Sequence, residues 1–63
     1  MARPARRQQL VRAAAAAFLE RGFDGTTMET VADHAGVTRM LVYRHFESKD
    51  ALYRAVLGAA FEQ

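Results

Sequence analysis

Apolar residues recur at helical spacing through the first third of the chain. They form one stripe at positions i, i+3, i+4, i+7 and i+8, namely Leu10, Ala13, Ala14, Ala17 and Phe18. Pro4 suits the first turn of a helix, and Gly22 suits the left-handed position after the last turn. The pattern therefore predicts an amphipathic helix from about Ala5 to Arg21.

A second, shorter helical pattern follows the turn at Phe23-Asp24-Gly25. Thr26 and Glu29 have the spacing of a capping box, in which a hydroxyl and a carboxylate bind the unpaired amides of the first turn. The apolar positions of this helix fit one face and are Met28, Val31, Ala32 and Ala35. Gly36 is expected to end it after about two turns, because glycine adopts the left-handed conformation without a Cβ clash.

Only two residues separate this helix from Thr38, which is a plausible N-cap of a third helix ending near Phe46. Val37, Val42 and Phe46 can pack inward. The positions left on the opposite side, where they would face a partner, are Arg39, Met40, Tyr43 and Arg44.

A fourth helix is predicted after Ser48, which serves as its N-cap, with Asp50 in the first turn where an acid is favourable. Its apolar stripe consists of Leu52, Ala55, Val56, Ala59 and Ala60. No stretch alternates as a strand would. The expected fold is therefore all-α, a small helical domain with three helices and the start of a fourth.

Length and composition restrict the choice further. Sixty-three residues suffice for one small domain, residues 1–63, and 51% hydrophobic with 25% charged residues is an ordinary globular composition. The chain has no cysteine, which excludes a disulfide framework, a thiol nucleophile and thiolate zinc ligands. No apolar run approaches the roughly 20 residues that cross a bilayer, so no membrane contact is expected. No metal or cofactor is expected either.

The net charge is +2, but the charges are unevenly distributed. Residues 1–12 carry four arginines and no acid, residues 20–33 are mostly acidic, and residues 38–49 are again mostly basic. Such segregation is typical of proteins that neutralise phosphates, although basic residues placed for solubility are the alternative. Two short helices with a tight glycine turn over about residues 27–46 predict a helix-turn-helix, whose second helix enters the DNA major groove.

Specific residues extend this prediction to a family. The ordered combination is Ala17-Phe18-Leu19-Glu20-Arg21-Gly22-Phe23, Thr26-Thr27-Met28, Val31-Ala32-Asp33-His34-Ala35-Gly36-Val37-Thr38 and Val42-Tyr43-Arg44-His45-Phe46-Glu47-Ser48-Lys49-Asp50-Ala51-Leu52. From about Arg7 to Val56 it closely resembles the N-terminal DNA-binding domain of TetR-family transcriptional regulators. The resemblance implies a cytoplasmic homodimer, most often a repressor, on a palindromic operator in double-stranded DNA. It also implies a C-terminal domain, absent from these residues, that dimerises and binds a small-molecule effector, with the fourth helix as the link.

The resemblance assigns several residues to the DNA backbone. Tyr43 and Lys49 match the tyrosine and lysine that contact phosphates in the family, and His45 matches a position that often does so. Arg44 is also expected on the backbone. Of Thr26 and Thr27, one is expected to cap the second helix and the other to bind phosphate, and the sequence does not allocate the two tasks.

Base contacts are expected from the start of the third helix, at Thr38, Arg39 and Met40. Arg39 can pair with O6 and N7 of guanine, with a phosphate contact as the alternative. The sequence departs from the family at Met40-Leu41, where a glycine or proline followed by a small residue is usual. Either both side chains touch thymine methyl groups, or Leu41 turns inward.

Three expectations remain. Arg3, Arg6 and Arg7 lie at the N-terminal end of the chain and could form an arm in the minor groove or a disordered tail. His34 is assigned to solvent. A helix-turn-helix that binds protein rather than DNA is the alternative function, and an enzyme is not expected because no nucleophile–base pair, phosphate-binding glycine loop or paired carboxylates occur.

Overall fold

The computed structural model describes the backbone of residues 2–61 and the side chains of residues 6–59. It consists of four helices, and no strand occurs between residues 2 and 61. The helices are α1 (Ala2–Arg21), α2 (Met28–Ala35), α3 (Arg39–His45) and α4 (Lys49–Phe61). The all-α prediction is confirmed.

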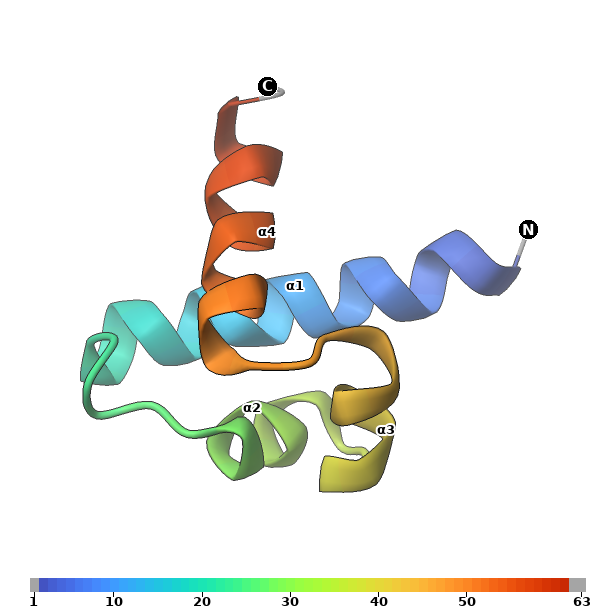
Figure 1. The fold of residues 1–63 in the computed structure, drawn as a ribbon, viewed down its shortest axis with the longest axis horizontal. Coiled ribbons are helices and arrows are strands. Elements are labelled where there is room, and N and C mark those ends of the chain that lie inside the picture. Colours follow the sequence, from blue (N-terminus) through green and yellow to red (C-terminus); the bar gives the residue numbers. More distant parts are fainter. Residues whose placement is uncertain (1, 62–63) are drawn as a thin grey trace.

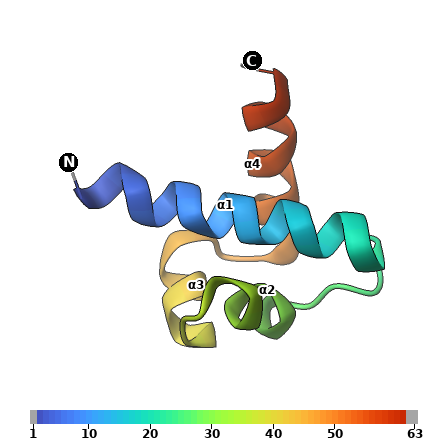
Figure 2. The ribbon, with the colours of Figure 1, turned by 180° about the vertical axis from the view of Figure 1, so that it is seen from behind.

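Helix α1 is the axis around which the others are arranged (Figure 1). Helices α2 and α3 lie together on one side of it, and α4 rises steeply away on the other side, which the view from behind in Figure 2 also shows. Helix α1 packs on both α2 and α4, while α3 packs mainly on α2. The C-terminal half of α4 therefore points away from the pair formed by α2 and α3.

A single apolar core joins the helices. Its buried side chains are Leu10, Val11, Ala13, Ala14, Ala17, Met28, Val31, Ala32, Val42, Phe46 and Leu52. The predicted stripes of α1 and α2 supply most of them, and the alanines of α1 allow its neighbours to approach closely. The predicted inward positions Val42 and Phe46 are confirmed as buried, and Val37 packs against the core.

Two predicted helix ends are confirmed and one start is wrong. Gly22 and Gly36 both have positive φ, +79° and +73°. The amides of Gly36 and Val37 bind carbonyls in the last turn of α2, which closes that helix. Helix α1, however, begins at Ala2 rather than near Ala5. Pro4 thus lies within the first turn, where an amide hydrogen is not needed by the helix.

The longer α1 also corrects the expectation of an N-terminal arm. Arg3, Arg6 and Arg7 belong to helix α1 rather than to an extended segment or a tail. The side chain of Arg3 lies outside the described residues, whereas Arg6 and Arg7 both contact other residues of the fold. Helix α1 thus holds Arg6 and Arg7 in place within the described fold.

The predicted stripe of α4 is only partly buried. Leu52 is fully buried and Ala55 and Val56 pack half-buried against the core, but Ala59 is exposed. The side chain of Ala60 lies outside the described residues. Burial decreases along α4 because the helix diverges from α1 (Figure 1), and its later turns line an open groove instead of the core.

Candidate nucleic-acid interface

Helix α3 presents one buried and one exposed face. Thr38 is its N-cap, as predicted, with its hydroxyl oxygen accepting a hydrogen bond from the Leu41 amide at 3.2 Å. Val42 and the C-cap residue Phe46 fix the buried face. The predicted outward set is confirmed as exposed and consists of Arg39, Met40, Tyr43 and Arg44. Thr38 and His45 are exposed beside them.

The first turn of α3 combines a hydroxyl, a guanidinium and a thioether. Met40 is 73% exposed, whereas the neighbouring Leu41 is partly buried. The two apolar residues that depart from the family pattern thus differ in position, because Met40 projects outward and Leu41 does so much less. Of the two, Met40 is therefore the better placed to touch a thymine methyl group.

The two adjacent threonines have separate tasks. Thr27 is the N-cap of α2, because its hydroxyl oxygen accepts a hydrogen bond from the Thr30 amide at 3.1 Å. The capping box predicted between Thr26 and Glu29 is therefore wrong. It lies one residue too early, and the side chain that meets the cap is the hydroxyl of Thr30, 3.0 Å from that of Thr27.

Thr26 is completely buried and is therefore not part of the candidate interface. Its hydroxyl lies 2.8 Å from the carbonyl oxygen of Gly22 and 3.1 Å from that of Ala17, and it donates to them. A side chain with no exposed surface cannot bind a phosphate. The expectation that Thr26 contacts the DNA backbone is wrong for this reason, and Thr27 alone remains exposed at the start of α2.

The side chain of Lys49 is held in place by two contacts with Phe23, unlike that of a solvated lysine. Its ammonium group donates a 2.7 Å hydrogen bond to the carbonyl oxygen of Phe23 and lies 4.2 Å from the centre of the Phe23 ring. These contacts join the start of α4 to the turn after α1. An ammonium has three donors, so this bond leaves capacity for a phosphate while fixing where the charge lies.

Beside Lys49, three aromatic rings pack together where α1, the following turn and α4 meet. The ring centres of Phe18, Phe23 and Tyr53 are 5.1–5.8 Å apart, in stacked and edge-to-face arrangements. This cluster could not be predicted from the sequence, because Tyr53 lies 30 residues from Phe23 in the chain and no local spacing joins them. It stabilises the angle between α1 and α4.

His34 is exposed, as expected, and it also has a partner that the sequence did not indicate. Its Nε2 lies 3.2 Å from Oε1 of Glu20, which joins the end of α2 to the end of α1. The side chain of His34 is 27% exposed, so the pair lies at the surface. Fourteen residues separate the partners in the chain, and only the packing of α1 on α2 brings them together.

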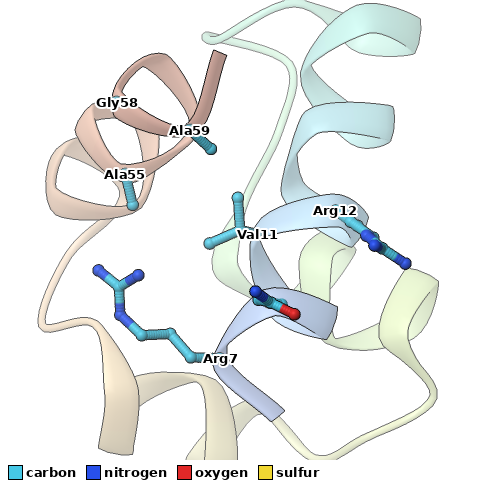
Figure 3. Close-up of a pocket in the computed structure, with 7 residues that line it drawn as sticks. Arg7, Val11, Arg12, Ala55, Gly58 and Ala59 are labelled. Carbon is cyan, nitrogen blue, oxygen red and sulfur yellow. The ribbon is translucent and has the colours of Figure 1, made fainter. Parts of the chain in front are cut away.

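An open groove of about 380 Å³ lies between α1 and α4. Figure 3 shows Arg7 directed into the groove, Val11 at its floor and Ala55 and Ala59 along its α4 side, with Arg12 directed outward. In the part of the chain that is described, no helix is long and apolar enough to cross a membrane.

The arrangement defines a helix-turn-helix protein: two short helices with a three-residue turn, the second anchored on one face and exposing basic and polar side chains on the other. The sequence model for bacterial regulatory proteins of the tetR family matches residues 10–56. The chain therefore belongs to the TetR family, and it is the DNA-binding domain of a transcriptional regulator of that family.

Individual relatives agree with this assignment. The chain is 47% identical over 55 residues to the HTH-type transcriptional activator FasR of Mycolicibacterium smegmatis, covering 87% of the chain and 25% of that protein. It is 41% identical over 54 residues to the HTH-type transcriptional repressor BepR of Brucella suis, covering 86% and 26%. The chain thus spans about a quarter of the length of these relatives.

A solved structure is similar throughout the described fold. The crystal structure of a putative TetR-family transcriptional regulator from Mesorhizobium loti superimposes with a TM-score of 0.88 at 39% sequence identity. The match covers 95% of this chain and 30% of the other. The predicted family is confirmed by all three comparisons.

Proposed function

We propose that the chain binds a palindromic operator as part of a homodimer, with α3 in the major groove, and that a small molecule bound to a C-terminal domain releases it. The main support for DNA binding is that α3 has one buried face and one exposed face, and that the exposed face holds two arginines. Thr38, Arg39 and Met40 contact base edges, because they occupy the first turn of α3, the part of a recognition helix that meets the bases.

The remaining candidates, which are exposed except for the partly buried Lys49, bind the DNA backbone. Thr27 contributes a hydroxyl at the start of α2, where free amides and the helix dipole favour an anion. Tyr43, Arg44 and His45 supply donors from the later part of α3, and Lys49 supplies a charge at the start of α4. Such contacts fix the position of the protein on DNA without selecting a sequence.

Selection of bound sites from a random DNA pool, followed by salt titration, tests this proposal. With about four phosphate contacts per subunit, log K should fall against log salt with a slope of about −3.6 for one subunit and about −7 for a dimer, since each phosphate contributes about 0.9. Enrichment of a half-site is expected. A slope near zero, or a selected pool that remains random, would reject the DNA interface.

The dimer proposal makes its own prediction for the 63 residues. Their apolar stripes are used to hold four helices around one core, and a stable dimer interface needs a large additional surface. The chain alone should sediment as a monomer in dilute solution. Fusion to an unrelated dimeric helical bundle with suitable spacing should raise operator affinity roughly 10²- to 10⁴-fold through effective concentration. A stable dimer of the chain alone would contradict the assignment of dimerisation to another domain.

We propose that features outside this domain decide whether the protein activates or represses transcription. FasR is named an activator and BepR a repressor, and both share this type of domain at more than 40% identity. Repression is the proposed mode for the whole protein, with the bound domain blocking access to its operator. In a transcription assay with the operator overlapping a promoter, the dimeric fusion alone should repress, without any response to a ligand.

A further inference from the structure

One turn of α1 is attached to the end of α2, just before the turn that leads to α3. The side-chain amide nitrogen of Gln9 donates a 2.8 Å hydrogen bond to the carbonyl oxygen of Ala35, 26 residues further along the chain. Arg6, one turn earlier in α1, donates a 3.2 Å hydrogen bond to the side-chain oxygen of the same Gln9. The three groups form a relay from α1 to the end of α2.

The Ala35 carbonyl is a significant attachment point. Ala35 is the last residue of α2, and carbonyls of the last helical turn have no partner within the helix. The amides of Gly36 and Val37 bind earlier carbonyls, those of Asp33 and Ala32. Gln9 thus binds the carbonyl next to the left-handed turn, three residues before Thr38, the N-cap of α3.

Arg6 determines which end of the Gln9 amide faces Ala35. A guanidinium only donates hydrogen bonds and a backbone carbonyl only accepts them. An amide between the two has one satisfactory orientation, with its oxygen toward Arg6 and its nitrogen toward Ala35. Without Arg6, only the Ala35 carbonyl would favour this orientation, and rotation of the amide would be less restricted.

The same segment of α1 also contacts the far end of the recognition helix. The Arg7 guanidinium lies 5.1 Å from the centre of the ring of Phe46, which is the C-cap of α3. In both ribbon views the N-terminal half of α1 passes beside α3 (Figures 1 and 2). Residues 6–9 therefore contact the structure on both sides of α3.

We propose that Gln9, oriented by Arg6, is a positioning residue that sets the angle of α3 and thereby the base preference of the domain. Helix α3 has only seven residues and a single buried side chain, so contacts near its ends add to its packing on α2 in setting its orientation. Bidentate contacts to base edges depend on that orientation, whereas long side chains adjust to phosphates. The proposal rests on the proposed DNA binding by α3.

The test compares Gln9→Met with Gln8→Met in the 63-residue chain. Methionine keeps the length of glutamine and removes the amide, and Gln8 is an exposed neighbour that lines the α1–α4 groove instead. Affinities for the site selected by the wild-type chain and for its single-base variants are measured by fluorescence anisotropy at one salt concentration. Circular dichroism melting of each variant monitors folding.

Gln9→Met should reduce the preference for the selected site by about 2- to 10-fold, the range that one hydrogen bond supplies. Binding to random DNA should change by less than about 2-fold, and Gln8→Met should change neither. A purely structural role would lower both affinities together, as the folded fraction falls. Equal losses on both DNAs, or an unchanged preference, would overturn the proposal.

Arg6 provides a second, independent measurement. Arg6→Met should reduce the base preference in the wild-type chain but have no further effect on it when Gln9 is already methionine, because Arg6 acts through Gln9. Additive losses of preference in the double variant would overturn the relay. If the wild-type chain selects no sequence at all, the proposed function fails with it, whereas a selective wild type with an unaffected Gln9→Met variant rejects only the positioning role.

Discussion

Helices α3 and α4 begin alike and then expose different chemistry. Each starts behind a hydroxyl cap: Thr38 accepts from the Leu41 amide at 3.2 Å, and Ser48 accepts from the Ala51 amide at 3.1 Å. Each buries one fully enclosed side chain, Val42 in α3 and Leu52 in α4. Capping and a buried anchor are therefore common helical requirements and do not distinguish a recognition helix.

What distinguishes the two helices is the support around them and the surface they leave open. Helix α3 is packed on α2 and has Arg7 of α1 at its C-cap, whereas α4 leaves α1 after its first turns. The open face of α3 carries two arginines, polar groups and Met40, while that of α4 includes Tyr53 and Leu57. The face of α3 therefore offers cations without an acid, whereas α4 combines one exposed arginine, Arg54, with an exposed acid, Asp50.

Truncation of Leu52, the buried side chain of α4, should have the largest effect on stability. Leu52→Ala should lower the free energy of unfolding by about 2–5 kcal/mol, because it removes buried apolar surface and leaves a cavity. Leu57→Ala, which truncates a residue of the same helix that is 41% exposed, should cost less than about 0.5 kcal/mol. Urea unfolding followed by circular dichroism measures both. Equal costs would mean that α4 is buried along its whole length.

Removing the Arg39 guanidinium of α3 should affect DNA binding rather than folding. Arg39→Ala should weaken binding to the selected site by roughly 1–3 kcal/mol and flatten the preference at one base pair of the half-site. Arg54→Ala, an exposed arginine of α4, is the matched control and should leave that preference unchanged. Equal losses for Arg39→Ala on selected and random DNA would place Arg39 on the backbone.

The adjacent threonines provide a finer test. Thr26→Val should cost about 1.5 kcal/mol of stability, since the Ala17 and Gly22 carbonyls lose the hydroxyl, while the folded protein keeps its DNA affinity. Thr27→Val should cost about 1 kcal/mol through the lost cap and should also weaken binding to all sequences. Unfolding curves and anisotropy titrations separate the two effects. Weaker DNA binding by fully folded Thr26→Val would contradict its exclusion from the interface.

The smallest effect is expected at Lys49. Lys49→Met should lower stability by about 1 kcal/mol, because the Phe23 carbonyl loses a donor, and should reduce the salt slope of DNA binding by about 0.9. Lys49→Arg keeps the charge and should preserve the slope. An unchanged slope in Lys49→Met would show that the ammonium serves the fold alone.

The sequence by itself determined the helices, their order and the family. Helix signals such as apolar stripes, terminal glycines and hydroxyl caps act within a few residues. The helix-ending role of Gly22 and Gly36 and the capping role of Thr38 and Ser48 could therefore be predicted from the sequence. The exposed set on α3 followed from the same local periodicity.

Tertiary structure alone decided which side chains remain available to a partner. Thr26 and Thr27 are equivalent in sequence, but the return of the chain past the end of α1 buries one and leaves the other at a helix start. The Gln9–Ala35 and Lys49–Phe23 contacts each join residues 26 positions apart. Such contacts depend on the angles between packed helices, which are set by the whole core and not by any local pattern.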